Sequence, residues 1–528
     1  MGSLVIDDTM QCHPSWVQKT YSQQYGFQEV MYNAISVTPG SPGLYLVGTA
    51  VTFSFTPSST SRTRSAYDLV PLLRNAWLQV RQQYPTLATE NRRECKVYTS
   101  PSSPAELEAW LDETFIVAPG KSWQDLYRAM VKTKYMTMHF CPEASQIFVQ
   151  GEHHSLDGRG AVTLIERFFR ALAAPASPHD LWRTDGTEVS RLPPRSEDLL
   201  PMRSPYPGRG EQHAMELLAP MNTMTSPIFL PVPSPLPGPS VFNSTHLLKS
   251  DKATTAAITA ACKAHRISVT AAWHAAVVLA TQSIQAASST SPAGTQFGTF
   301  GNFDLRRYFP SSSAADDTHS ISNHHAILPY VVSTLDSPPS KPSSVPSSAP
   351  ADVPKPKPFL ILAKELDTFY KTNLTSSPST LPSLPHLVRL LTPTLTKPVL
   401  EGSTPGLSSL GVVDRMIAGE YAGEKGTWTV EDVWFGDTAR GPWLECFMWG
   451  FRGELVVSSC WNESFYAEGA VEGFHGKVLE VLQGSLGVGV NEGMEGSVGE
   501  GGREEKKGVE GVNGKGNGEG EGAKSGKL

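Results

Sequence analysis

A histidine doublet shortly before an aspartate is the part of the sequence best suited to chemistry. His153 and His154 precede Asp157 on a short segment, and a glycine follows the aspartate. The flanking residues predict a strand over 145–150 and a helix over 161–170. A neutral imidazole on such a loop can point into a cleft and act as a general base, while a buried aspartate fixes the loop from behind. This segment is therefore our candidate catalytic loop.

Other interpretations of the same residues lead to different functions. In a purely structural interpretation, the loop histidine caps a turn and Asp157 caps the following helix. A zinc or iron site is disfavoured, because the side chains of His153 and His154 point to opposite sides of an extended segment. The sequence contains neither the Gly-x-Ser-x-Gly segment of serine hydrolases nor a phosphate-binding Gly-x-x-x-x-Gly-Lys-Ser/Thr loop. General-base catalysis and a structural turn remain.

Length, charge and cysteine content indicate a large protein that acts on small molecules. At 528 residues the chain exceeds one ordinary core and predicts two domains. The net charge of -7, with both signs interspersed, disfavours nucleic acid as the principal partner. The six cysteines are widely spaced, as expected for reduced, mostly buried thiols. Because we find no secretion or lipidation signal and no run of about twenty apolar residues, which a membrane span requires, we expect a cytoplasmic protein. We also expect it to be a monomer.

Hydrophobic periodicity predicts strands and amphipathic helices in both halves of the chain. In the first half we expect strands over 44–55, 134–140 and 146–150 and helices over 66–83, 105–115, 123–131 and 161–170. In the second half we expect strands over 241–248, 297–303, 325–332, 444–450 and 454–460, and helices over 251–265, 268–280, 358–370 and 464–482. Residues 407–413 are expected to form a short strand or a turn. The helices are expected to pack on the sheets that these strands form.

Changes in composition divide the chain into four parts. Residues 1–182 form an N-terminal lobe with the candidate loop, and residues 183–240 form a crossover rich in Pro, Ser and Gly. Residues 241–485 form a C-terminal lobe, interrupted by a Ser/Pro tract at 337–358 that is too polar to pack. Residues 486–528 form a Gly/Glu/Lys tail that cannot bury enough apolar surface to fold.

The order of several segments resembles the CoA-dependent acyltransferase superfamily, which includes BAHD enzymes, condensation domains and chloramphenicol acetyltransferases. The candidate loop is similar to the His-x-x-x-Asp-Gly signature of that superfamily. Further segments resemble its Asp-x-Arg, Gly-Asn and Ser-x-x-Gly segments and the segment after its late hairpin: residues 302–310, Ser322-Asn323 with Pro329, residues 407–411 and residues 461–465. The similarity extends over about residues 40–485. Within the superfamily the chain is most similar to fungal trichothecene 15-O-acetyltransferases and related enzymes of secondary metabolism.

The resemblance implies an α/β fold of two chloramphenicol-acetyltransferase-like lobes. Each lobe would be a mixed sheet flanked by helices, with the active-site channel between the lobes. It also implies an acyl-CoA-dependent O-acyltransferase, with acetyl-CoA as co-substrate and no metal. The acceptor would be a hydroxyl of a small terpenoid-like secondary metabolite, as in mycotoxin biosynthesis.

The resemblance also assigns roles to individual residues. Alignment on Asp157 makes His153 the general base, whereas a one-residue deletion in the loop would give that role to His154. Asp157 would turn away from the substrate and pair with Arg306 across the lobes. Gly158 would permit a tight turn into the helix.

Ser408 is a candidate oxyanion donor on the Ser-x-x-Gly strand, although its hydroxyl has the alternative of a partner within the sheet. A second doublet, His324-His325, lacks a following Asp-Gly and is expected to be a core or interface pair.

Two other functions fit the same fold. One is a condensation-type acyltransferase that takes its acyl group from a carrier protein, although this chain contains no Gly-x-Asp-Ser carrier segment. The other is a non-catalytic binding protein.

Overall fold

The computed structural model describes most of the chain between residues 20 and 489. The described residues are 5–7, 20–37, 45–58, 65–202, 208–232, 242–288, 293–310, 319–335, 355–372, 374, 377–396, 402–439, 441–489 and 495–498. The Ser/Pro tract expected at 337–358 lies almost wholly outside these residues, as does most of the C-terminal tail.

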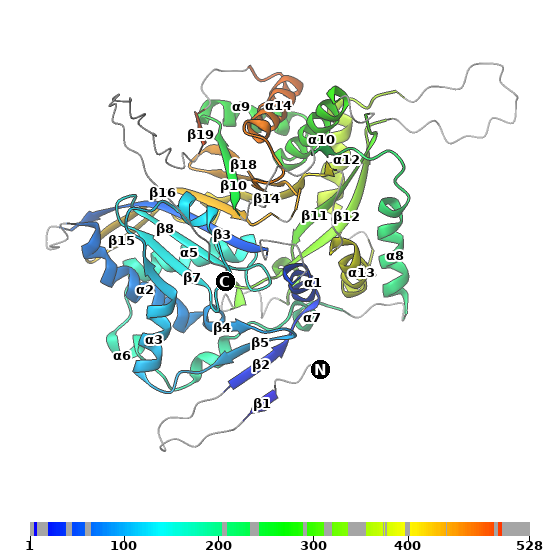
Figure 1. Ribbon diagram of the computed structural model, residues 1–528. Helices are drawn as coiled ribbons and strands as arrows, with labels where there is room; N and C mark the ends of the chain where they lie inside the picture. The colour runs from blue at the N-terminus through cyan, green and yellow to red at the C-terminus, as the bar shows by residue number, and fades with distance from the viewer. Residues whose placement is uncertain are drawn as a thin grey trace, which may run out of the picture.

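The first lobe is built on a six-stranded mixed sheet in the order β15-β16-β3-β8-β7-β6. Its strands are β3 (Leu46–Pro57), β6 (Phe115–Val117), β7 (Thr137–Cys141), β8 (Gln146–Glu152), β15 (Glu420–Gly423) and β16 (Gly426–Asp437). Its helical segments are η1 (Ala66–Leu69), α2 (Val70–Gln83), η2 (Pro85–Ala88), α3 (Pro104–Thr114), α4 (Trp123–Arg128), α5 (Gly158–Ala173) and α6 (Pro178–Leu181). The sheet and the helices α2, α3 and α5, which lie together in Figure 1, share one hydrophobic core.

A smaller four-stranded sheet extends this lobe. Its order is β1-β2-β5-β4, from β1 (Val5–Asp7), β2 (Thr20–Gln24), β5 (Cys95–Thr99) and β4 (Thr89–Asn91).

The second lobe is built on a five-stranded sheet in the order β14-β17-β18-β10-β19. Its strands are β10 (Asn243–Lys249), β14 (Gly406–Val412), β17 (Glu445–Phe451), β18 (Glu454–Asn462) and β19 (Glu495–Val498). The helices are α9 (Lys252–Ala264), α10 (Val269–Ala287), α12 (Phe359–Thr372) and α14 (Ala470–Leu486). They lie together at the top of Figure 1 and contribute to a second core.

A long two-stranded ribbon lies beside both lobes. It consists of β11 (Gln296–Asp304), which continues into η4 (Arg306–Tyr308), and β12 (His325–Ser333). A third apolar cluster joins the ribbon to α1 (Phe27–Ser36), α8 (Arg209–Asn222) and α13 (Thr380–Leu395). The antiparallel register pairs Asp304 with His325, which brings one end of β11 and the start of β12 to the same place. The remaining short elements are η3 (Thr187–Arg191), α7 (Ser196–Leu199), β9 (Leu230–Pro231), β13 (Gly402–Ser403) and η6 (Val413–Arg415).

The structure confirms the predicted α/β class of mixed sheets flanked by helices, but three features differ from the expected division. Strand β16 belongs to the C-terminal half of the sequence and yet pairs with β3 over its whole length in the first lobe. Helix α8 lies within the stretch that we expected to be only a crossover. Part of the tail expected to lack structure, β19, pairs with β10.

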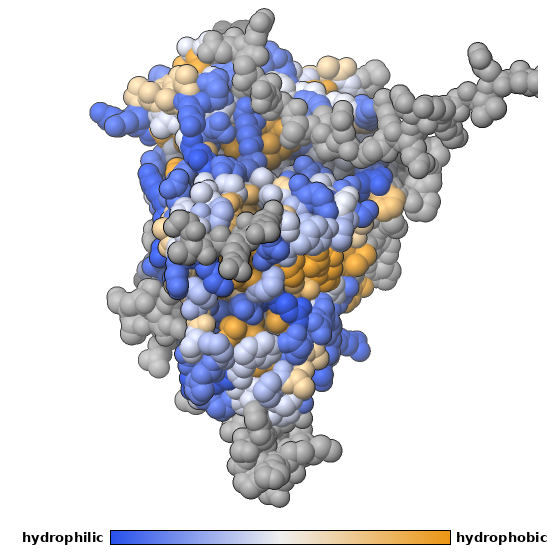
Figure 2. Space-filling model, turned by 90° about the vertical axis from the view of Figure 1, so that its left-hand side faces the viewer, coloured by the Kyte–Doolittle hydropathy of each residue, from blue (hydrophilic) through white to orange (hydrophobic). Residues whose placement is uncertain are grey.

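Among the described residues, no single helix is long and apolar enough to cross a membrane. Helices α9 and α10 reach that length and apolar content only when taken together, and the chain bends by 97° between them. On the face drawn in Figure 2, hydrophilic residues predominate around a group of hydrophobic residues near the centre.

Candidate active site

The candidate loop connects β8 to α5 and separates the two histidines of the doublet. The main-chain N–H of His153 donates to the carbonyl of Tyr45 (3.1 Å), which continues the pairing of β8 with β3. The His153 ring lines a cavity between the lobes. His154 is 1% exposed, packs edge-on against Tyr25, and has its Nε2 3.5 Å from Glu152 Oε2. Only the first histidine of the doublet therefore faces the cavity.

The cavity has a volume of about 150 Å³, and both lobes contribute to its wall. This is below the range of about 300–1,000 Å³ typical of pockets that enclose a whole drug-sized ligand. Asp157, Arg306 and Ser408, which we predicted from the sequence, line the same cavity as His153. Among the described residues, no group of three His, Cys, Asp or Glu side chains is arranged to hold a metal ion.

Aromatic packing fixes the ring of His153. The ring is stacked on Tyr32 with a centroid distance of 4.0 Å and an interplanar angle of 8°, and on Tyr45 with 5.3 Å and 22°. Its Nδ1 is buried without a hydrogen-bond partner among the described residues. Burial, reinforced by the nearby His325, lowers the pKa of His153 to about 3. The imidazole is therefore neutral at physiological pH, as a general base must be.

A chain of hydrogen bonds connects the loop backbone to the stacked tyrosine. Asn323 Nδ2 donates to the carbonyl of His153 (2.9 Å), which leaves Asn323 Oδ1 to accept from Nδ1 of His325 (2.8 Å). In that tautomer His325 Nε2 accepts from the hydroxyl of Tyr32 (2.8 Å). Burial lowers the pKa of His325, which keeps it in this neutral form. This series of hydrogen bonds therefore holds both the main chain of His153 and the ring of Tyr32, on which the imidazole is stacked.

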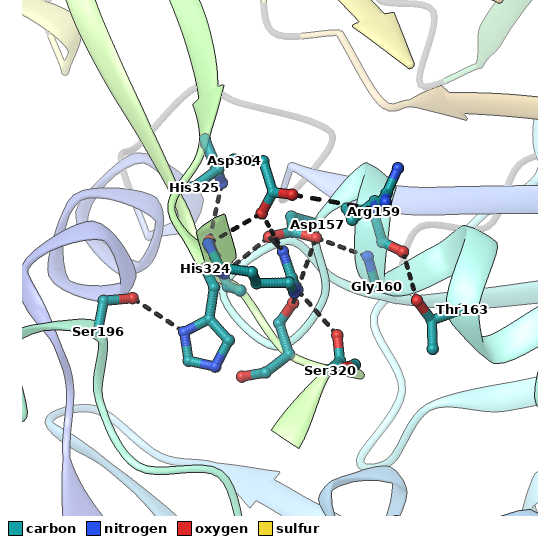
Figure 3. Close-up of polar contacts among 12 residues, drawn as sticks. Asp157, Arg159, Gly160, Thr163, Ser196, Asp304, Ser320, His324 and His325 are labelled. Atoms are coloured by element: carbon teal, nitrogen blue, oxygen red, sulfur yellow. Dashed lines mark hydrogen bonds and ion pairs between the residues drawn. The ribbon is translucent and has the colours of Figure 1, made fainter. Parts of the chain in front are cut away.

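Asp157 forms the expected ion pair with Arg306. Figure 3 shows Asp157 beside Gly160, at the start of α5. Nη1 and Nη2 of the guanidinium donate to the two carboxylate oxygens of Asp157 at 2.9 and 3.1 Å. The N–H of Gly160 donates to Oδ1 (2.7 Å), so Asp157 also caps α5, and the N–H of His324 donates to Oδ2 (2.7 Å). Although burial opposes ionisation, Arg306 holds the pKa of Asp157 well below its usual range.

Arg306 also joins the loop to the end of the β11–β12 ribbon. Its Nη1 donates to Asp304 Oδ1 (3.1 Å), and its Nη2 donates to the carbonyls of Ser320 and Ser322 (both 2.8 Å). The guanidinium is therefore the centre of a buried network that includes the start of α5, the end of β11 and the segment before β12. We call the Asp157–Arg306 pair with these partners the loop clamp.

The structure places the remaining predicted site residues as follows. Gly158 is the first residue of α5, directly after the capping residue Asp157, and its φ is not positive. A Cβ at this position would lie 2.7 Å from a methyl carbon of Leu410 on β14, so a larger residue would require the Leu410 side chain to shift. Ser408 lies on β14, whereas the neighbouring hydroxyl of Ser409 is 2.9 Å from that of Thr270. The role of Ser408 as an oxyanion donor stays a prediction.

Sequence reasoning missed several residues of the cavity. One of them is His325, from the second doublet, which we expected to be a core or interface pair. His324 is indeed buried, whereas His325 lines the cavity. Tyr32 and Tyr45 come from segments without a recognisable motif. The only available signal was Asn323, which follows Ser322 in the segment similar to Gly-Asn.

We expect the substitution Arg306→Gln to destabilise the folded protein by about 3–5 kcal/mol, because it leaves the buried carboxylate of Asp157 without its counter-ion. A matched control is Arg159→Gln, since Arg159 is half-exposed and lies 4.0 Å from Asp304, and such pairs contribute about 0–1 kcal/mol. Denaturant unfolding measures both.

The clamp also predicts a pH dependence. Because the pKa of Asp157 is lowered in the folded state, its stabilisation is present above the ordinary aspartate pKa of about 4 and is lost as the pH falls toward the folded pKa. The difference between wild type and Arg306→Gln should therefore shrink below about pH 4. A difference that is constant with pH would contradict an ionised Asp157.

Known proteins with similar sequences include enzymes that transfer acetyl groups. Acetyltransferase pigO of Monascus ruber is 25% identical over 410 residues, which cover 75% of this chain and 82% of that protein. O-acetyltransferase pigM of Monascus ruber is 25% identical over 432 residues, which cover 80% of this chain and 76% of that protein. A protein of Epichloe uncinata named loline biosynthesis cluster 1 transcription factor lolU1 is also 25% identical, over 454 residues, covering 79% and 85%. No protein-family model matches the chain.

Solved structures of the same fold extend over nearly the whole chain. TRI3 trichothecene 15-O-acetyltransferase from Fusarium sporotrichioides aligns with a TM-score of 0.73 at 15% identity, covering 91% of this chain and 97% of that one. The first condensation domain of the CDA synthetase aligns with a TM-score of 0.55 at 12% identity, covering 88% and 96%. The chain is therefore similar in sequence to two acetyltransferases, and it shares its fold with an O-acetyltransferase and a condensation domain.

Proposed function

We propose that the protein transfers an acetyl group from acetyl-CoA to a hydroxyl of a terpenoid-like, trichothecene-like secondary metabolite. The observation that carries this proposal is the position of His153: its neutral ring lines the cavity between the lobes, while Asp157 is paired with Arg306 in the loop clamp. The names of the two Monascus ruber relatives and of the TRI3 structure support the acetyl group and the hydroxyl acceptor.

In the proposed mechanism, His153 is the general base. Its Nδ1 is enclosed, so we assign Nε2 to the acceptor. Nε2 takes the proton of the acceptor hydroxyl as the oxygen attacks the thioester carbonyl. The tetrahedral intermediate expels the CoA thiolate, which takes the proton back from the imidazolium. A base positioned in this way typically accelerates the reaction by about a hundred- to ten-thousandfold.

The size and position of the cavity suit a direct transfer between two substrates. Its volume of about 150 Å³ has room for the reacting ends of acetyl-CoA and the acceptor, but not for a whole coenzyme. The rest of each substrate would extend into approaches on either side. Ser408, on the wall contributed by β14, is the candidate donor to the oxyanion of the intermediate.

Two other functions on this fold predict different behaviour. A condensation-type enzyme would use an acyl group on a carrier protein and would not use free acetyl-CoA. A non-catalytic protein, for which the name of the Epichloe uncinata relative is a specific reason, would bind ligands without turnover. Both are distinguished from the proposed function by an assay with labelled acetyl-CoA and a panel of terpenoid alcohols.

The substitution His153→Ala should lower kcat/KM by about a hundred- to ten-thousandfold, because it removes the base. His154→Ala is the matched comparison. It removes a ring that is buried outside the cavity, so its main effect should be on thermal stability, with kcat/KM at low temperature within about threefold of wild type. Release of the CoA thiol measures turnover. Unchanged turnover in His153→Ala would contradict the assignment.

The lowered pKa of His153 predicts the pH profile of the free enzyme. A histidine of ordinary pKa would be protonated below about pH 6.5 and would lose activity there. Because the pKa of His153 is lowered to about 3, kcat/KM for an alcohol without an amino group should stay flat as the pH falls from 8 to about 5.5. Initial rates at low substrate concentration test this. A decline centred near pH 6.5 would show a base with an ordinary pKa.

Tyr32→Phe should lower kcat by about two- to tenfold, because it removes one neutral hydrogen bond to His325 and keeps the ring stacked on His153. Tyr32→Leu, which also removes the stacking, should lower kcat further. The control is Tyr25→Phe, which removes a hydroxyl that donates to the carbonyl of Arg92, outside the cavity. Steady-state kinetics should show the change in kcat and little change in the KM for acetyl-CoA; a change confined to KM would refute a positioning role.

A further inference from the structure

Two acidic side chains on the wall of the cavity have no opposite charge beside them. The charged lining residues are two arginines and four carboxylic acids. Both arginines lie beside carboxylates of the loop clamp region, Asp157 and Asp304. The two acids that remain are Asp437 and Glu445, and neither forms an ion pair with a cation in the part of the chain that the structure describes. The wall of the cavity therefore has an excess of acidic groups.

These two acids come from different lobes and line the same cavity as His153. Glu445 is the first residue of β17, and its Oε1 accepts from the hydroxyl of Tyr45 at 3.5 Å. The ring of Tyr45 is in turn stacked on that of His153. Asp437 is the last residue of β16 and is 5% exposed. Its Oδ1 is buried and has no hydrogen-bond partner among the described residues.

The protonation of the pair reflects the missing counter-ion. Burial raises the pKa of Glu445 to about 7. Burial and the nearby Glu445 raise the pKa of Asp437 well above its usual range. Two such carboxyl groups retain at least part of their protons at neutral pH because ionising both would leave like charges together in a dry site.

We infer that Asp437 and Glu445 form a subsite for a protonated amino group, so that the acceptor is a hydrophobic alcohol that also carries a basic nitrogen. This inference rests on the proposed function and refines its substrate class. An ammonium group supplies both the N–H donors and the positive charge that the pair lacks, and hydrogen bonds between charged groups are roughly twice as strong as neutral ones. A neutral alcohol would supply only a donor.

The other substrate is a less suitable occupant. The phosphates of CoA are anionic and would be repelled by the pair. The pantetheine arm has amide N–H groups but no positive charge, so it would not replace the missing counter-ion. The position of Glu445 next to Tyr45, on which His153 is stacked, places the amino group near the acceptor hydroxyl.

The first experiment compares two alcohols of the same shape. Tropine is a bicyclic alcohol with a tertiary amine, and its carbocyclic analogue has carbon in place of the ring nitrogen. We expect wild type to prefer tropine in kcat/KM by about tenfold or more. In Asp437→Asn and in Glu445→Gln the preference should fall to about threefold or less, whereas Glu420→Gln, which changes an exposed carboxylate, should retain it.

Three results would overturn the inference: equal use of the two alcohols by wild type, an unchanged preference in both variants, or a neutral diol used as well as tropine. Thermal unfolding of each variant establishes that it is folded.

The second experiment does not require turnover. Binding of an ammonium group should ionise the pair and release up to about one proton. Calorimetry of tropine binding in buffers of different ionisation enthalpy measures this release, which should be lost in Asp437→Asn. Binding without proton release in wild type would refute the subsite. Loss of acetyl transfer to every alcohol with normal tropine binding would refute only the proposed function.

Discussion

The buried pair of Asp157 and Arg306 is the interaction on which the geometry of the cavity depends. It connects the start of α5 to the end of the β11–β12 ribbon, and the guanidinium also binds two main-chain carbonyls there. A buried ion pair is weak evidence for stability, because desolvation of both charges offsets much of their attraction. Removal of one partner is nevertheless costly. The clamp therefore acts mainly by making other arrangements of the loop unfavourable, which keeps the ring of His153 in one place.

The clamp also determines what Asp157 cannot do. Its two oxygens accept from Arg306 and from the N–H groups of Gly160 and His324. A carboxylate with its acceptor positions filled in this way is held ionised and has little capacity left for a proton or a metal. Within the described residues, the Nδ1 of His153 therefore has no carboxylate partner. His153 is held by stacked tyrosines and by Asn323 on its carbonyl, so its position is set by packing and its basicity is low.

Local features were predictable from sequence where local interactions determine them. The N-terminus of α9 is capped by Asp251, which accepts from the N–H of Thr254, and the β17–β18 hairpin turns at Arg452-Gly453, where both residues have positive φ. Helices α8 and α13 were missed because they contain prolines and lie near tracts that we read as irregular. Their apolar faces are buried together in the third cluster, and this packing outweighs the prolines.

The candidate loop was predictable for a similar reason, and the rest of the cavity was not. In an extended segment alternate side chains face opposite sides, which separates His153 from His154 without any knowledge of the fold. The same rule cannot predict which face of β12 points into the cavity, because residues on both faces are buried. The position of His325 follows from its register opposite Asp304, and no local pattern specifies that register.

The crossing of β16 into the first lobe relates the fold to the choice of acceptor. This strand carries Asp437 at its end, and the chain then returns to the second lobe, where β17 begins with Glu445. The two acids without counter-ions, Asp437 and Glu445, therefore lie at the two ends of the segment that connects the first lobe to the second. A shift of one lobe against the other would change their separation as well as the distance of His153 from the opposite wall. Because the clamp connects the loop of His153 to the β11–β12 ribbon, the same network that positions the proposed base would also fix the subsite that we propose for the amino group of the acceptor.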